Sequence, residues 1–121
     1  MNIGVMGSKG ESMVARFLKD NGYVIVARNY QCRFGEIDII AENEEFILFV
    51  EVKTRKENSA VPIEEAVDFK KQKRMVITAE DFLVKKPTNK QPRFDVALVT
   101  IKRNNESNRD SYSLKYIENA F

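Results

Sequence analysis

The stretch GEIDIIAENEEFILFVEVKTR, residues 35–55, places acidic and basic side chains inside two otherwise apolar segments. Because side chains alternate along a β-strand, Glu51 and Lys53 lie on one face of the same strand, about 7 Å apart at ~3.4 Å per residue. A tight hairpin around residues 43–46 would bring Asp38 beside Glu51. Two carboxylates and an ammonium group then meet at one edge of a sheet.

This combination of residues indicates metal-assisted phosphoryl chemistry. Crowded carboxylates repel one another, and a divalent cation relieves the repulsion by supplying the opposite charge. Carboxylate oxygens favour hard cations such as Mg²⁺ or Mn²⁺, and Mg²⁺ takes its remaining ligands from water and substrate phosphate. Lys53 could then orient or deprotonate the attacking water, or neutralise charge that builds up on the scissile phosphate.

A purely structural interpretation stands beside this one. Glu51 and Lys53 could form a same-face ion pair on a solvated strand end, worth ~0 to 1 kcal/mol. A strand that is otherwise apolar on both faces is, however, an unfavourable place for idle charge. Glu36, two residues before Asp38, fits either a supporting group of the site or an exposed acid at the start of a strand.

Glu11 is a further candidate ligand. It falls on the apolar face of a predicted helix together with Val14 and Leu18, which aims its carboxylate at the sheet. Ser8 and Glu11 also match the S-x-x-E capping box, in which Glu11 would bond to its own helix N-terminus. Spacing alone favours the capping box.

The composition excludes several kinds of site. With no His and a single cysteine, Cys32, the chain has no histidine-based nucleophile system, no multi-cysteine metal site and no internal disulfide. Its 121 residues suit one domain, 1–121, and no apolar run is long enough for a membrane span. The N-terminal MNIGVMGSKGE shows no export signal, so we expect a cytoplasmic protein that does not enter a membrane.

The elements that must position the site follow from periodicity. The pattern predicts a helix within residues 8–23, strands at 23–28, 36–41, 46–53, 93–101 and 112–117, and a second helix at 63–86 after Pro62. Residues 29–35 and 102–111 are predicted loops, the latter the most mobile. The order αβββαββ predicts an α/β domain with a mixed sheet. The strand 46–53 is apolar on both faces and is therefore expected at the centre of a covered sheet.

Basic residues cluster around the second helix. The net charge of +2 is only weakly basic, so their distribution matters more than their number. The segment KKQKR begins near the start of this helix, where it could reach the edge that carries Lys53 and contact a phosphate backbone. The candidate nucleic-acid contacts are Arg55, Lys70, Lys71, Gln72 and Arg74.

At this point the residues resemble a known family. GESMVARFL, GEIDIIAENEEFILFVEVKTR, KQKRMVITAEDFL, RFDVALV and IENAF together resemble the small bacterial YraN family, in order and over nearly the whole chain. That family is similar to the PD-(D/E)XK nuclease superfamily, particularly archaeal Holliday junction resolvases. The resemblance implies a restriction-endonuclease-like αβββαββ core, with a mixed central sheet flanked by helices.

The resemblance also implies roles for individual residues. Asp38 would be the first metal-binding acid, and Glu51 and Lys53 the acid and lysine of the E-x-K element. Glu11 would match the helix-one glutamate that resolvase-like members add to the metal site, which favours a metal ligand over a cap. Ile37 stands where the superfamily's name has a proline, and this departure leaves the ligands intact.

On the helix that follows the E-x-K strand, the match is looser. Lys71 and Gln72 fall where superfamily members often place a further polar site residue.

The leading hypothesis is a Mg²⁺- or Mn²⁺-dependent endonuclease that hydrolyses DNA, including branched or structured DNA in repair or recombination. A nucleic-acid-binding module that keeps the fold without catalytic turnover is the alternative. A third reading is a structural or interaction protein in which the charges form a buried network, so that Asp38→Asn would lower thermal stability. If four-way junctions were the target, their symmetry would favour a homodimer.

Overall fold

The computed structural model describes residues 3–57 and 67–121, and the statements below concern this part of the chain. Its elements are α1 Ile3–Asp20, β1 Val24–Cys32, β2 Gly35–Glu42, β3 Phe46–Lys56, α2 Phe69–Lys85, β4 Gln91–Asn104 and β5 Arg109–Ile117. The order is αβββαββ, as predicted. The α/β class and a core consistent with a restriction-endonuclease-like fold are confirmed.

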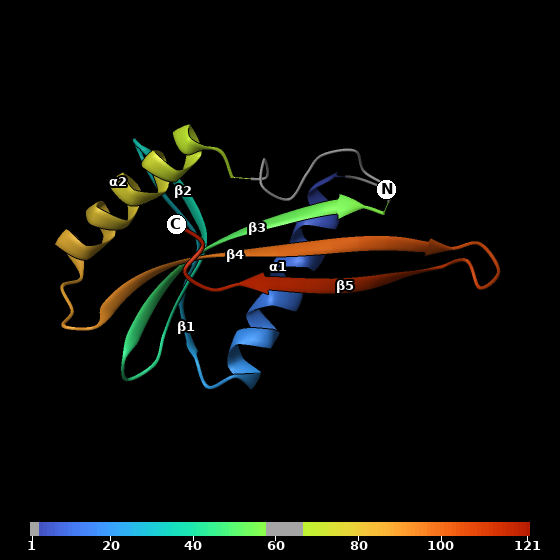
Figure 1. Ribbon diagram of the computed structural model, residues 1–121, viewed down its shortest axis with the longest axis horizontal. Coiled ribbons are helices and arrows are strands. Elements are labelled where there is room, and N and C mark those ends of the chain that lie inside the picture. The colour runs from blue at the N-terminus through green and yellow to red at the C-terminus, as the bar shows by residue number, and fades with distance from the viewer. Residues whose placement is uncertain (1–2, 58–66) are drawn as a thin grey trace.

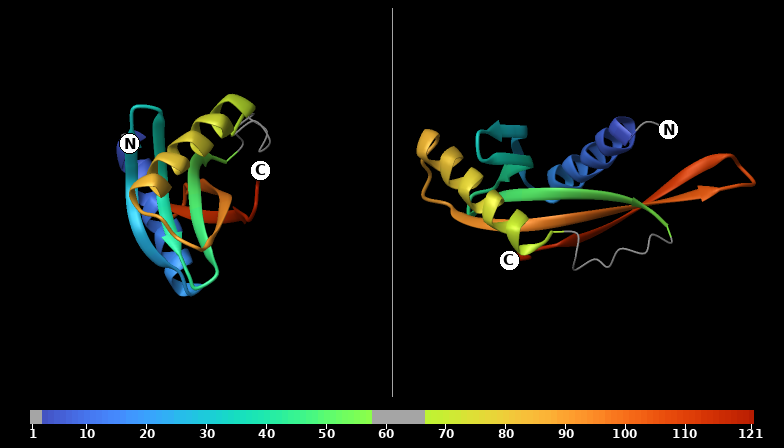
Figure 2. Two further views of the ribbon diagram at one scale, coloured as in Figure 1. Left: turned by 90° about the vertical axis from the view of Figure 1, so that its left-hand side faces the viewer. Right: turned by 90° about the horizontal axis from the view of Figure 1, so that it is seen from above.

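One five-stranded mixed sheet has the strand order β1-β2-β3-β4-β5. Strands β3 and β4 run parallel, and the other neighbouring pairs are antiparallel. Helices α1 and α2 cover opposite faces of the sheet (Figures 1 and 2). In β3, Leu48 and Val50 pack into the core under α1, whereas Ile47 and Phe49 pack into the core under α2. The prediction of a central strand, apolar on both faces, is confirmed.

Helix α1 starts earlier than the capping box would allow. It begins at Ile3, so Ser8 lies inside the helix rather than at its N-cap, and the capping box predicted for Ser8 and Glu11 is wrong. At its other end, α1 stops at Asp20. Gly22 has a φ of 88°, and its N–H donates to the carbonyl of Lys19 at 3.1 Å, which closes the last turn.

Helix α2 starts later than predicted. Pro62 and residues 63–66 lie outside the described residues, and among those described the helix begins at Phe69. Asp68 is the N-cap, and its carboxylate accepts a hydrogen bond from the backbone N–H of Lys71 at 2.8 Å. Because this cap satisfies a backbone donor, the helix begins just after Asp68, and Val67 lies outside it and packs beside Met75.

The predicted loops at 29–35 and 102–111 are largely strand. Strand β1 continues to Cys32 and pairs with Gly35 across a short turn, and β4 pairs with β5 as far as Asn104 and Arg109. Their polar composition is typical of loops, but backbone pairing holds these residues in ladders without an apolar core beneath every residue. As a result, the β4–β5 hairpin projects beyond the body of the molecule as an arm (Figures 1 and 2).

Neither helix of the described ranges has the length and apolar character needed to cross a bilayer.

Candidate active site

The candidate site lies where β2 and β3 separate. Their ladder runs from Glu42 opposite Ile47 to Ile39 opposite Val50. Beyond this last pair, the side chain of Asp38 replaces the backbone as the partner of β3. Its Oδ2 accepts a hydrogen bond from the backbone N–H of Val52 at 2.8 Å. The carboxylate thus occupies a place where a backbone carbonyl would otherwise pair, which fixes its position relative to β3.

Glu51 lies next to this break and is almost fully buried, with 4% of its surface exposed. Its side chain hydrogen-bonds with that of Asp38. Its Oε1 is 3.8 Å from the Nζ of Lys53 and forms a second ion pair with the Nζ of Lys71 on α2. The structure therefore brings Asp38, Glu51 and Lys53 together, as the sequence predicted. Lys71, which we expected to contact nucleic acid, joins them through its ion pair.

Burial gives both carboxylates unusual protonation. Burial, and then the neighbouring charge of Asp38, raise the pKa of Glu51 to about 7. Burial also raises the pKa of Asp38, although the Val52 N–H and the hydrogen bond with Glu51 act in the opposite direction. Glu51 therefore titrates near neutral pH, and Asp38 also binds its proton more tightly than an ordinary aspartate does.

This shift predicts a measurable pH dependence of stability without metal. The pKa of Glu51 is raised from an ordinary 4.5 to about 7, so the folded state holds the proton more tightly than the unfolded chain. The stabilisation is complete below about pH 4.5 and is lost as the pH rises through about 7, with a change on the order of 3 kcal/mol.

The measurement is chemical unfolding in EDTA between pH 4 and 8.5. The difference in unfolding free energy between the natural protein and Glu51→Gln, whose amide does not titrate, isolates this group. A difference that does not vary with pH would contradict the raised pKa.

The two lysines divide their roles. A hydrogen bond with Lys71, and then burial, lower the pKa of Lys53. Burial opposes the charge of Lys71, but hydrogen bonds with Glu51 and Lys53 outweigh it and raise its pKa. Lys53 is thus the amine that more readily gives up its proton, while Lys71 holds the positive charge.

Glu11 approaches the site from α1. Its Oε1 is buried and has no hydrogen-bond partner among the described residues, although it forms an ion pair with the Nη2 of Arg28 at 3.9 Å. Burial, and then the charge of Asp38, raise the pKa of Glu11. A buried carboxylate oxygen without a hydrogen-bond donor destabilises the folded state, so a donor or a cation is expected to bind it.

The donor atoms suit a hard cation. Within residues 3–57 and 67–121, no three Asp, Glu or Cys side chains group closely enough to hold a metal ion by themselves. Asp38 and Glu51 nevertheless form a pair of oxygen donors. Glu11, whose Oε1 has no hydrogen-bond partner, is near enough to Asp38 for the charge of Asp38 to raise its pKa. Mg²⁺ commonly uses one or two carboxylates plus waters and phosphate oxygens, so this donor set fits Mg²⁺ or Mn²⁺ once Lys71 moves aside.

The other predicted residues surround the site more loosely. Lys70 and Arg74 are exposed on α2, and Arg55 is half-buried on β3. The Nε2 of Gln72 donates to the carbonyl of Val67 at 3.2 Å, which holds it at the helix start. Exposed Glu36 accepts a hydrogen bond from Gln31 at 3.1 Å, in keeping with the strand-start interpretation.

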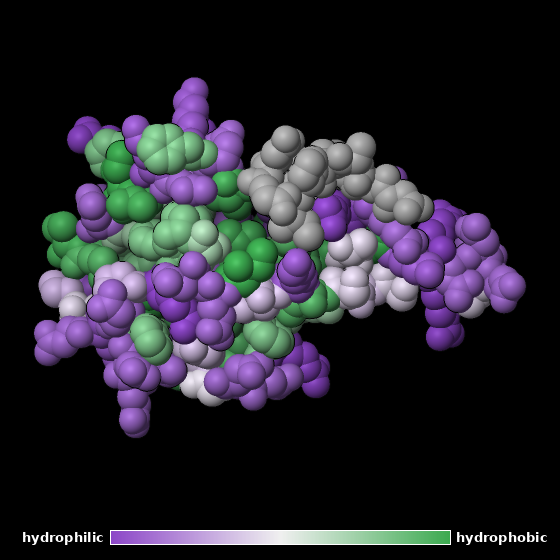
Figure 3. Space-filling model, viewed as in Figure 1, coloured by the Kyte–Doolittle hydropathy of each residue, from purple (hydrophilic) through white to green (hydrophobic). Residues whose placement is uncertain are grey.

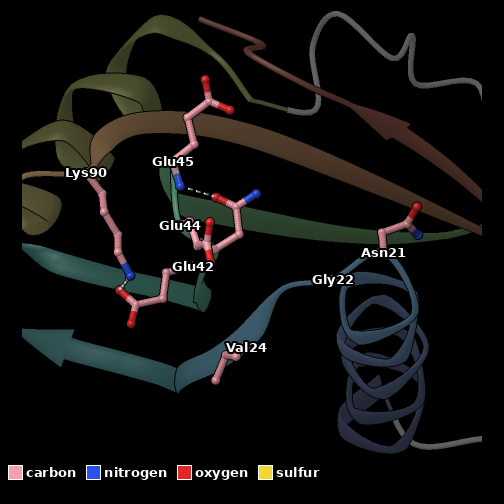
Figure 4. A pocket seen from close by; sticks show the side chains of 8 residues that line it. Asn21, Gly22, Val24, Glu42, Glu44, Glu45 and Lys90 are labelled. Atoms are coloured by element: carbon pink, nitrogen blue, oxygen red, sulfur yellow. Dashed lines mark hydrogen bonds and ion pairs between the residues drawn. The ribbon is translucent and has the colours of Figure 1, made fainter.

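A separate hollow lies at the opposite end of β2 and β3 (Figure 4). Glu42, Glu44, Glu45 and Lys90 line it, together with the end of α1. Lys90 forms an ion pair with Glu42 at 3.2 Å. None of the predicted site residues reaches this hollow.

Comparison with known proteins identifies the family. The model of the uncharacterised protein family UPF0102 matches residues 10–99. A UPF0102 protein of Clostridium botulinum (strain 657 / Type Ba4) is 42% identical over 118 residues, covering 96% of this chain and 93% of its own length. A UPF0102 protein of Clostridium acetobutylicum is 43% identical over 117 residues, covering 95% and 92%. This chain therefore belongs to the UPF0102, or YraN, family, as its motifs predicted.

Proposed function

We propose that this protein is a cytoplasmic, metal-dependent endonuclease that hydrolyses DNA phosphodiester bonds. The observation that carries the proposal is the pair of buried carboxylates, Asp38 and Glu51, beside Lys53. Such pairs are typical of functional sites, because each carboxylate raises the energy of the other's charged form and the arrangement is unfavourable for stability alone.

The chain's own residues can be assigned roles in this reaction. A Mg²⁺ or Mn²⁺ ion, when bound, would polarise the scissile phosphate and lower the pKa of a bound water. Asp38 and Glu51 would hold that ion, with Glu11 completing the set from α1. Lys53, whose amine is 3.8 Å from Glu51, would orient the attacking water or accept its proton. Lys71, released from Glu51, remains charged and can pair with a phosphate oxygen.

A cleavage assay tests the proposal. We expect cleavage of at least one DNA among duplex, flap, single-stranded and four-way substrates, and only with Mg²⁺ or Mn²⁺ present. Asp38→Ala should abolish it, because the ion would lose a ligand whose position the Val52 N–H fixes. Asp110→Ala, on the distant hairpin, is the matched control and should cleave normally. Absence of any cleavage that Asp38→Ala removes would refute the proposal.

One observation favours a binding module without turnover as the second candidate. The ion pair between Lys71 and Glu51 already supplies the positive charge that a metal would bring. Titration with Mn²⁺ separates the two functions. An endonuclease should bind Mn²⁺ and lose this binding in Glu51→Gln, whereas a binding module should bind DNA equally well with and without the substitution.

A further inference from the structure

The sheet face that carries Glu51 and Lys53 continues past α2 along the β4–β5 hairpin. Val96 and Leu98 pack on the α2 side, so alternation places Thr100 and Lys102 on that same side further along β4. Ile117 of β5 packs against the hydrophobic cluster that contains Val96 and Leu98, so its side chain also points to the α2 side of the sheet. The residues of β5 on this side are Lys115, Ser113, Ser111 and Arg109.

The register aligns these residues into rows across the strands. Lys53 of β3 is opposite Leu98, which is opposite Lys115. Arg55 is opposite Thr100, which is opposite Ser113. Beyond β3, Lys102 pairs with Ser111 and Asn104 with Arg109. We call this surface, made of Lys53, Arg55, Thr100, Lys102, Arg109, Ser111, Ser113 and Lys115, the hydroxyl–cation face.

The opposite face of the same hairpin has another character. Val99, Tyr112 and Leu114 pack against the core under α1. The hydroxyl–cation face instead exposes Lys102, Ser111, Ser113 and Lys115 to solvent. Hydrophilic side chains gather over the end of the arm in Figure 3.

The charge on this face is one-sided although the chain is nearly balanced, with 20 basic and 18 acidic residues. Five of the eight residues of the face are cations. Two acids lie near its outer part: Glu106 in the turn of the hairpin, and Glu57, whose Oε1 is 3.9 Å from the Nζ of Lys102 with both side chains substantially exposed. Such an ion pair holds its members weakly, so a phosphate can replace the carboxylate.

We propose that the hydroxyl–cation face binds the phosphodiester backbone of duplex DNA and leads one strand to Asp38 and Glu51. The inference rests on the proposed function, since it assigns the path of that substrate. Lysine and arginine attract phosphates and release their counterions, and serine and threonine hydroxyls donate hydrogen bonds to phosphate oxygens. The tyrosines of β5, Tyr112 and Tyr116, pack on the other side, so the face offers no ring on which a single-stranded base would stack.

The dimensions agree with this partner. From Arg109 to Lys115 the strand rises about 20 Å at ~3.4 Å per residue, which equals the rise of about six base pairs. The face begins at Lys53, 3.8 Å from Glu51, so a bound backbone reaches the carboxylates directly. At that inner end Lys115 and Gln72 line one hollow between α2 and β5, which joins the face to the predicted contacts on α2.

The test is a triple variant, Lys102→Gln/Arg109→Gln/Lys115→Gln, titrated with a fluorescent 20-base-pair DNA duplex in EDTA at several salt concentrations. Loss of three phosphate contacts should weaken binding roughly a hundredfold at 0.1 M salt and lower the slope of log K against log salt by about 2.7. The matched control, Arg16→Gln/Lys19→Gln/Lys86→Gln, removes the same charge from exposed positions elsewhere. It should change affinity by less than about fivefold and leave the slope nearly unchanged.

Equal losses in both triple variants, no loss in the first, or no duplex binding by the natural protein at 50 mM salt would each overturn the inference. Because binding is measured without metal, its outcome is independent of cleavage. If the natural protein cuts DNA but the first triple variant binds normally, the inference fails and the endonuclease stands. If that variant loses binding and no protein cuts, the face stands and the endonuclease fails.

Discussion

Replacement of Lys53 by methionine is expected to slow DNA cleavage by about 100- to 10,000-fold at saturating Mg²⁺ and DNA. The methionine keeps the length and the apolar stem of the lysine but removes the amine. That amine is 3.8 Å from Glu51, beside the carboxylates that would hold the ion, so it is placed to orient the attacking water or take its proton. Single-turnover kinetics with labelled duplex measures the effect.

Lys56→Met provides the matched control. Lys56 is on the same strand, β3, but three residues away and therefore on the opposite face, where it is exposed. We expect it to cleave at a rate within about threefold of the natural protein, since surface changes away from the site have small effects. A Lys53→Met protein that cleaves as fast as the Lys56→Met protein would remove Lys53 from the reaction. A loss of DNA affinity of more than tenfold in Lys53→Met, with the rate unchanged, would make it a binding residue.

Replacement of Asp95 by alanine is expected to lower the free energy of unfolding by about 3 to 5 kcal/mol. Asp95 is fully buried, and the Nε and Nη2 of Arg93 donate to its carboxylate at 2.9 Å. The hydroxyl of Tyr116 donates at 2.6 Å and the backbone N–H of Asn119 at 2.9 Å. Removing the carboxylate leaves a nearly buried guanidinium and two other donors without their partner.

The charge states agree with this network. The hydrogen bond to Asp95 raises the pKa of Arg93, and burial followed by the hydrogen bond to Asp95 raises the pKa of Tyr116. Both groups therefore keep their protons at neutral pH. The network acts as a permanent link between β4 and the end of β5.

Urea unfolding compares Asp95→Ala with two further proteins. Asp20→Ala, at an exposed aspartate at the end of α1, should change stability by less than about 0.5 kcal/mol. The double variant Arg93→Met/Asp95→Leu should recover part of the loss, because it no longer buries an unpaired charge. A loss below about 1 kcal/mol in Asp95→Ala would contradict a structural role for the network.

The local pattern of the sequence determined the core of the fold. Alternation along residues 46–53 placed Leu48 and Val50 on one face and Ile47 and Phe49 on the other, and the structure covers both faces with helices. This works because side-chain direction in a strand has a period of two and depends on neighbouring residues alone. The same rule put Glu51 and Lys53 on one face.

The boundaries of the elements were less accessible to sequence reasoning. The start of α2 depended on Asp68, whose carboxylate caps the helix, whereas the apolar periodicity continued through Val67. The extent of the β4–β5 hairpin depended on backbone pairing, which polar residues such as Asn104 satisfy as well as apolar ones do. Periodicity reports burial, and neither a cap nor an exposed ladder requires burial.

Only the tertiary structure decided which distant groups meet. The sequence contained Asp38, Asp95 and Lys71, but it did not show that Asp38 accepts a hydrogen bond from the Val52 N–H, that Asp95 accepts one from Tyr116, or that Lys71 pairs with Glu51. Each of these contacts joins residues on different elements, so they depend on how helices and strands pack. The sequence by itself determined the chemical groups and the faces they occupy, and the packing of the sheet and helices decided their partners, because long-range distances are set by the fold and not by local periodicity.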